Sequence, residues 1–182
     1  LGLVEREVPV TEANPAKSRK GLYRIADPFI ATWYRFVHPF RDRLERGLVD
    51  QVLELNVSPR LHHHLSMAVE PLMRELILSP PLAELIPFQP AYAGRYWSPT
   101  TELDLVLLDQ SRTRAFVGEI KWSSGVPVSH LSNLRRRVAA EPAFAEMECT
   151  HALISRDGFS GPREQVTTED HLIDLSALRL GG

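Results

Sequence analysis

Two adjacent segments with the composition of buried strands constrain the fold of this chain most. Residues 101–109 and 114–122 are rich in apolar and β-branched side chains, and five turn-like residues, 110–114, lie around their junction. Apolar runs of this length, bounded by turn residues, are typical of strands that pair in a hairpin. The sequence therefore predicts an antiparallel β-hairpin in the second half of the chain.

Three charged side chains share one face of this predicted hairpin. If the hairpin is symmetric about residues 111 and 112, Asp104 lies directly opposite Glu119. Side chains alternate along a strand, so Glu119 and Lys121 point to the same face. Like charges that face each other across strands destabilise a sheet, and a divalent metal held by both carboxylates would offset the repulsion. We therefore expect a metal site here; the alternative is a structural salt bridge, which a direct bond between Lys121 and a carboxylate would favour.

Composition narrows the class of protein. The chain has 182 residues, enough for one well-buried core, and a net charge of −2, so any nucleic acid must bind to a local basic patch. Its single cysteine, Cys149, excludes an intrachain disulfide and fits a reducing cytoplasm. No apolar run is long enough to cross a membrane, and no signal peptide is visible. Because the chain begins at Leu1 in a strand-like stretch, we interpret it as part of a longer protein.

The first third of the chain predicts a hairpin and two helices. Residues 3–10 and 21–25 read as two strands with a long basic tip between them. Asp27 before a proline predicts an N-cap that opens an aromatic-rich helix through Val37, and a second helix follows over 40–55.

The remainder predicts a small α/β core. Ser58-Pro59 repeats the cap-plus-proline pattern and predicts the start of a third helix, which ends before Pro80. The further elements are a short helical turn before Pro87, strands at 88–96, 101–109 and 114–122, a helix over 128–140, and strands at 150–155 and 172–175. The predicted order is therefore α-β-β-β-α-β, with a mixed central sheet flanked by helices.

This order, with an acid on the second strand and Glu-x-Lys on the third, resembles the PD-(D/E)XK, or restriction-endonuclease-like, nuclease superfamily over residues 58–175. More narrowly, the chain resembles the C-terminal domain of unknown function of archaeal-type AAA ATPases. The strings that carry this resemblance are Tyr23-Arg-Ile-Ala-Asp-Pro-Phe29, Trp33-Tyr-Arg-Phe36, Gly94-Arg-Tyr-Trp97, Glu102-Leu-Asp-Leu105 and Gly118-Glu-Ile-Lys-Trp122.

The resemblance implies a metal-dependent nuclease site. Asp104, Glu119 and Glu70, on the first core helix, would be ligands of Mg²⁺ or Mn²⁺, and Lys121 would orient or deprotonate the attacking water. The implied substrate is DNA. Diverged members can keep the fold and lose turnover, so one alternative is a catalytically inactive DNA-binding or regulatory module. A second is a protein-interaction domain that forms a homodimer through the helical segment 27–55.

The resemblance also implies a domain organisation. Residues 1–25 would be the remnant of a winged helix, 26–57 a helical linker or docking segment, and 58–182 the nuclease-like domain. The partners would be the N-terminal ATPase and winged-helix domains of the same intact chain. The Gly-x-x-x-x-Gly-Lys-Ser/Thr phosphate loop is absent from this sequence, so we do not expect this fragment to bind ATP.

Two basic groups are candidates for nucleic-acid contact. Lys17, Arg19 and Lys20 lie on the tip of the first predicted hairpin, where a wing would touch the phosphate backbone. Arg135 and Arg136 belong to three consecutive arginines on the predicted helix 128–140, and the alternative for them is a solvated helix face. His62, His63 and His64 do not predict a metal site, because consecutive residues on a helix point about 100° apart.

Overall fold

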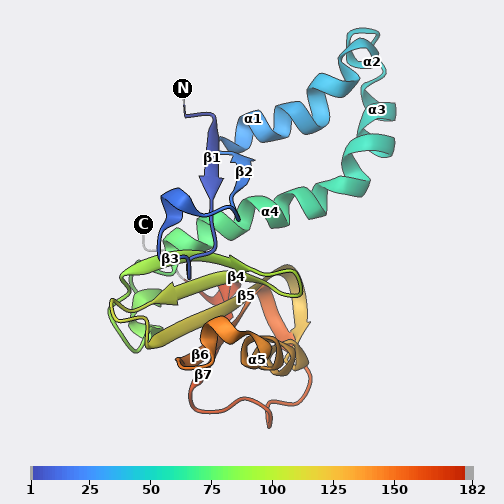
Figure 1. The fold of residues 1–182 in the computed structure, drawn as a ribbon. Helices are drawn as coiled ribbons and strands as arrows, with labels where there is room; N and C mark the ends of the chain where they lie inside the picture. The colour runs from blue at the N-terminus through green and yellow to red at the C-terminus, as the bar shows by residue number, and fades with distance from the viewer. Residues whose placement is uncertain (1, 179–182) are drawn as a thin grey trace. The chain divides into compact units, whose positions relative to one another are not determined.

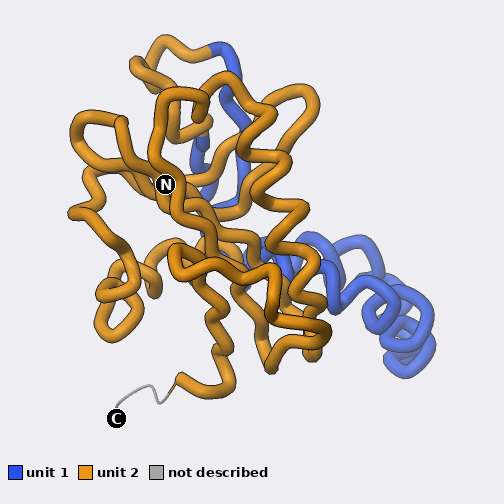
Figure 2. Tube along the Cα trace, turned by 90° about the horizontal axis from the view of Figure 1, so that it is seen from below, with its two compact units in different colours: residues 1–7, 19–69 blue, residues 8–18, 70–182 orange. Residues whose placement is uncertain are grey.

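The computed structural model describes residues 2–178 and has a mixed α/β architecture (Figure 1). The chain divides into two compact units (Figure 2): Leu1–Glu7 with Arg19–Val69, and Val8–Ser18 with Glu70–Gly182. We call them the first and the second unit. The compact units divide the chain at Glu70, whereas the sequence predicted a domain that begins at Ser58; the predicted functional domains stay a prediction.

A five-stranded sheet forms the centre of the second unit, and its strands lie side by side in chain order. The β3–β4 and β4–β5 pairs are antiparallel, while β5–β6 and β6–β7 are parallel, so the sheet is mixed. The strands are β3 Tyr92–Trp97, β4 Glu102–Leu108, β5 Arg114–Pro127, β6 Glu148–Ser160 and β7 Asp170–Asp174. Helix α4, Ser58–Leu76, precedes β3, and α5, Ser129–Ala140, connects β5 to β6. The predicted α-β-β-β-α-β order is confirmed, and β7 follows it.

The predicted register of the central hairpin is also confirmed. Leu105 pairs with Gly118 and Leu108 with Ala115, which is the alignment that places Asp104 opposite Glu119. Strand β5 is longer than expected, because its pairing with β6 resumes beyond an irregularity between Lys121 and Ser124 and continues to Pro127. The regular β4–β5 pairing ends at Leu105 and Gly118, so Asp104 and Glu119 lie one position beyond it, where the β3–β4 pairing also shifts register.

Asp109 organises the turn of this hairpin. Its carboxylate accepts hydrogen bonds from the backbone N–H groups of Thr113 (2.8 Å) and Arg114 (2.9 Å), and from the Ser111 hydroxyl. Arg112, at φ 57°, has the left-handed conformation that the tight turn requires. Its guanidinium lies 4.4 Å from the centre of the Tyr92 ring. The turn residues thus hold the register that aligns the two strands.

Helix α5 covers one face of the sheet. Its buried side chains Leu131, Leu134 and Val138 pack in one apolar cluster with Val106 of β4 and Val117 of β5. Glu119 lies two residues from Val117 and pairs with Arg137 of α5, so it points to the same, α5-covered face. Asp104, whose pKa is raised by burial and also responds to the charges of Glu119, Lys121 and Arg137, lies near it. The packing of α5 therefore brings a helix directly over the charged part of the hairpin.

The first unit contains the predicted N-terminal hairpin and cap. Strand β1, Val4–Glu7, pairs antiparallel with β2, Leu22–Ile25. Asp27 caps α1, Pro28–Thr32, by accepting hydrogen bonds from the backbone N–H groups of the second and third helical residues, at 2.8 and 3.1 Å. Both features were read correctly from local sequence signals.

The second predicted helix is interrupted, and the third begins at Ser58 as predicted but without the predicted cap. Helix α2, Arg41–Glu45, ends before Gly47, whose φ of 78° breaks the helix. From α3, Val49–Val52, the chain then passes through a π-helical turn, Leu53–Val57, into α4. Ser58 itself is helical, with φ −53° and ψ −44°, and does not act as a cap.

A wide turn precedes each of two prolines in these helices. Pro39 follows the π-helical turn Trp33–Val37, and Pro59 follows Leu53–Val57. A proline lacks the N–H and crowds the carbonyl four residues earlier, and a wider turn relieves both problems. The remaining short helices are 3-10 turns: Pro15–Lys17, His38–Phe40, Leu82–Leu85, Pro142–Phe144 and Leu175–Ala177. Within residues 2–178, no helix is both long and apolar enough to span a membrane.

Candidate active site

Asp104 is a half-buried carboxylate on β4 with one oxygen that has no partner. Its Oδ2 accepts a hydrogen bond from the backbone N–H of Ile120 at 2.9 Å. Its Oδ1 has no hydrogen-bond or ion-pair partner among residues 2–178. Burial, together with the negative charge of Glu119, raises the pKa of Asp104. This carboxylate can therefore accept a further positive charge or donor.

Glu119, in contrast, is saturated with cationic partners. It is 6% exposed, and the Lys121 Nζ lies 2.8 Å from its Oε1. The guanidinium of Arg137 pairs with its Oε2, and His130 Nδ1 lies 3.5 Å from Oε1. As predicted, Glu119 and Lys121 share a face of the sheet. Their direct bond is the one that the salt-bridge interpretation expects.

Arg137 and His130 are site residues that the sequence reasoning missed. They lie seven positions apart on α5, which is two helical turns, so both point to the same flank of the helix. Arg137 also donates to the backbone carbonyl of Glu102 at 3.0 Å. The guanidinium therefore joins the end of α5 to both β4 and β5.

Glu70 is half-buried on α4, in the second unit. Arg74, one helical turn later, donates to the backbone carbonyl of Asp104 at 3.1 Å, so this face of α4 borders the start of β4. In the described part of the chain, no group of three or more His, Cys, Asp or Glu side chains is arranged to hold a metal ion. The assignment of Glu70 as a third ligand stays a prediction.

The two carboxylates are suitable ligands for a divalent cation, but one of them is already paired with two cationic side chains. Two carboxylates are ligands that Mg²⁺ and Mn²⁺ prefer, and the unpartnered oxygen of Asp104 is available to one. Glu119, however, already faces Lys121 and Arg137. A cation can bind both acids only if one of these two side chains moves away from Glu119.

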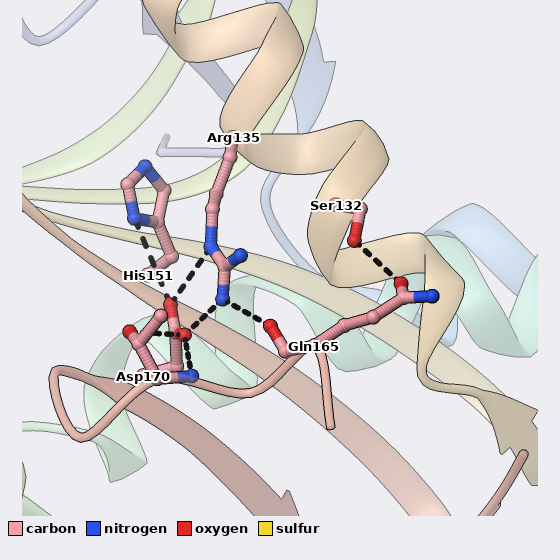
Figure 3. A network of polar contacts seen from close by, with 6 residues as sticks. Ser132, Arg135, His151, Gln165 and Asp170 are labelled. Atoms are coloured by element: carbon pink, nitrogen blue, oxygen red, sulfur yellow. Dashed lines mark hydrogen bonds and ion pairs between the residues drawn. The ribbon is translucent and has the colours of Figure 1, made fainter. Parts of the chain in front are cut away.

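The Arg135 side chain is bonded to other residues of the protein, Asp170 and Gln165 (Figure 3). Its guanidinium pairs with Asp170, through Nε at 3.1 Å and also through Nη2, which in addition donates to the Gln165 carbonyl at 2.8 Å. The Asp170 side chain is 2% exposed and also accepts hydrogen bonds from Thr167. His151, whose pKa is lowered by burial, lies beside this pair with its Nδ1 4.0 Å from Asp170. These bonds tie α5 to the first residue of β7.

The other predicted nucleic-acid contacts are exposed. Arg136 donates to Asn133 Oδ1 on its own helix at 2.9 Å and otherwise faces outward. Lys17, Arg19 and Lys20 are exposed as well. The three histidines do not converge: His62 and His63 are exposed, and His64 Nε2 contacts the Thr32 hydroxyl at 2.8 Å.

Comparison with known sequences finds relatives of unknown function. The model of the family DUF234, "Archaea bacterial proteins of unknown function", matches residues 33–137, which include Asp104, Glu119, Lys121 and Arg137. The uncharacterized protein MJECL04 of Methanocaldococcus jannaschii is 31% identical over 119 residues. The aligned region is 65% of this chain and 26% of that relative, so the chain spans about a quarter of its length.

Among solved structures, the chain is similar to a repair endonuclease from Pyrococcus abyssi. The sequence identity is 14% and the TM-score 0.39, over 58% of this chain and 46% of that protein.

Proposed function

This chain belongs to the DUF234 family, and we propose that its central sheet carries a metal-dependent nuclease site that hydrolyses phosphodiester bonds of DNA. One observation supports the proposal most. Asp104 and Glu119 lie on the neighbouring strands β4 and β5, one position beyond the Leu105–Gly118 pair, and the Lys121 Nζ lies 2.8 Å from Glu119 Oε1. Folding alone gives little reason to oppose two acids in a sheet.

In this proposal the two acids bind the metal, and Lys121 acts on the attacking water and on the phosphate. Asp104 and Glu119, with Glu70 as a third ligand, would hold Mg²⁺ or Mn²⁺, which when bound activates a water molecule and polarises the phosphate. Lys121 orients the attacking water or accepts its proton at Nζ. The same side chain, in its charged form, neutralises the charge that develops on the phosphate oxygens.

The substrate and the context of the reaction are part of the same proposal. Lys17, Arg19, Lys20 and Arg136 would contact the DNA backbone, since their side chains are exposed. Arg135 would contribute only by leaving Asp170. We further propose that the chain is the C-terminal part of a cytoplasmic archaeal-type AAA ATPase, in which ATPase and winged-helix domains precede it. The sequence strings quoted above support that assignment.

A catalytically inactive DNA-binding or regulatory module is the second candidate. The ion pairs on both oxygens of Glu119 favour it, because a closed charge cluster satisfies this carboxylate without a metal. The two candidates differ in metal dependence. A docking module binds DNA without a divalent ion and depends on its exposed basic residues.

Cleavage of supercoiled plasmid DNA in Mg²⁺ or Mn²⁺ separates the two candidates. We expect the wild type to nick the plasmid and the Asp104→Asn and Lys121→Ala variants to be about 100-fold slower or inactive. Asp42→Asn and Arg163→Ala, which make the matching charge changes at exposed positions, serve as controls. Wild-type protein that binds the plasmid without nicking it, in either metal, would establish the inactive module. Nicking that survives in Asp104→Asn would reject this site.

A further inference from the structure

The guanidinium of Arg137 occupies the part of the site where a metal would meet Glu119. It pairs with Glu119 Oε2 and donates to the Glu102 carbonyl, two residues before Asp104. It thus spans the two strands that carry the acids. Lys121 does not link the two strands in this way, because it lies on β5 beside Glu119 and pairs with its other oxygen, Oε1.

The charges at this point of the sheet are already balanced. Two carboxylates, Asp104 and Glu119, face two cationic side chains, Lys121 and Arg137. A divalent cation added to this cluster would meet a neutral site and would have to overcome two positive charges nearby. Once Arg137 has left, the two acids outweigh Lys121, and the unpartnered Oδ1 of Asp104 together with Glu119 Oε2 becomes a favourable pair of ligands.

Two members of the cluster can move: the side chains of Arg137 and Lys121 are 35% and 37% exposed, whereas that of Glu119 is 8% exposed. Of the two, Arg137 is the one that holds Glu119 Oε2 and also bonds to β4. An arginine on the flank of a helix can turn outward by rotation of its long stem without displacing the buried residues of α5. His130, at 3.5 Å from Glu119, is the only other described α5 side chain that contacts this carboxylate.

We propose that Arg137 is an internal counter-ion that competes with the divalent metal for Glu119, so that metal binds only when Arg137 swings away. The inference rests on the proposed metal site and adds how that site is regulated. A ligand that binds Arg137 away from Glu119 allows the metal to bind. An anionic ligand such as a DNA phosphate is suited to do so, because a guanidinium released from Glu119 binds a phosphate oxygen with similar geometry.

Titration with Mn²⁺, followed by electron paramagnetic resonance of the free ion in the absence of DNA, tests the competition. We expect Arg137→Gln to bind Mn²⁺ about tenfold more tightly than the wild type, the factor that corresponds to losing one charge-assisted bond. Arg136→Gln removes the same charge from the same helix and should bind as the wild type does. Asp104→Asn, added to Arg137→Gln, should abolish the gain.

Circular dichroism checks that Arg137→Gln is folded, and Arg137→Lys is a second variant that tests the same competition if it is not. Lysine keeps the charge but cannot bridge Glu119 and the Glu102 carbonyl with two N–H groups, so its affinity should lie between those of the wild type and Arg137→Gln. If the wild type binds Mn²⁺ and neither Arg137 variant binds it more tightly, the competition is refuted while the metal site stands. If none of these proteins binds Mn²⁺ at Asp104, the proposed metal-dependent function fails and the competition fails with it.

Discussion

Arg135 and Arg137 leave opposite flanks of α5 and pair with acids on two different strands of the sheet. Arg135 binds Asp170 at the start of β7, and Arg137 binds Glu119 in the middle of β5. The buried residues between these flanks pack on the sheet. The helix is therefore held at three lines of contact, two of them ionic, and each arginine has a separate consequence that can be measured.

Removal of Arg135 should destabilise the second unit. Arg135→Ala leaves the Asp170 carboxylate, 2% exposed, with its charge unpaired. Loss of one partner of a buried ion pair costs about 3 kcal/mol of unfolding free energy. Urea denaturation followed by circular dichroism measures the loss, and Arg136→Ala should change stability by less than about 0.5 kcal/mol. Equal stability of Arg135→Ala and the wild type, with weaker DNA binding, would instead support a direct phosphate contact.

Neutralising each of the two acids of the candidate site should change the stability of the protein in opposite directions. Burial raises the pKa of Asp104, so the folded protein favours the protonated form and carries a cost above the folded pKa. Asp104→Asn removes that cost and keeps an oxygen for the Ile120 N–H. We expect a higher melting temperature than that of the wild type at pH 7. The difference should vanish below the pKa of an unfolded aspartate, about 3.9.

Neutralising Glu119 should have the reverse effect. Glu119→Gln removes the carboxylate that Lys121 and Arg137 share, and because both cations are more than a third exposed and screened by solvent, we expect a loss of about 1 kcal/mol at pH 7. Urea denaturation at pH 7 gives the value. A second substitution, Arg137→Gln, should recover part of the loss, because it removes one of the two stranded cations. No recovery in the double variant would argue that the two cations do not repel each other there.

These contrasts show where sequence reasoning succeeded and where it stopped. The β4–β5 register up to Leu105 and Gly118, next to Asp104 and Glu119, follows from hairpin symmetry alone, because the turn held by Asp109 fixes it. The cap at Asp27 is equally local. Ser58 carries the same signal, yet a π-helical turn, Leu53–Val57, runs directly into it, so Ser58 lies inside a continuous helical stretch and does not cap it.

The partners of the three consecutive arginines, Arg135 to Arg137, could not be predicted from the sequence. With 3.6 residues per turn, Leu131, Leu134 and Val138 define the buried stripe, which leaves Arg136 outward and sets Arg135 and Arg137 on its two flanks. That much is readable from the sequence. Which acid meets which flank depends on how α5 crosses the sheet, and no local pattern encodes that crossing.

The buried Glu141 carboxylate should make the second unit sensitive to acid. Hydrogen bonds from the hydroxyls of Thr101, Tyr96, Ser98 and Thr100 lower its pKa. A lowered pKa stabilises the fold above the unfolded value, about 4.3, and this contribution is lost as the pH falls through the folded value. Glu141→Gln should cost about 2 kcal/mol at pH 7, and the deficit should shrink toward pH 3. Urea denaturation at the two pH values tests this, and a constant deficit would contradict it.

The basic residues at the tip of the first hairpin should contribute to DNA affinity through salt-dependent contacts. Replacing Lys17, Arg19 and Lys20 by alanine should weaken binding of a duplex. Every phosphate that the variant no longer neutralises should also flatten the slope of log affinity against log salt by about 0.9. Fluorescence anisotropy at several salt concentrations measures both effects. Alanine at Arg41, Arg43 and Arg46, on and just after α2, is the matched control, and an equal change in that variant would assign the effect to net charge alone.

The segment between β1 and β2 has a consequence for how the protein can be dissected. Residues 8–18 belong to the second unit: Val10 bonds to the Arg95 carbonyl at 2.9 Å, and Arg112 donates to the Thr11 carbonyl at 2.8 Å. The backbone therefore passes between the two units three times, after Glu7, Ser18 and Val69. A single protease cut at any of these places leaves two covalent links intact. A fragment that starts at Ser58 would lose an edge segment of its own α/β unit.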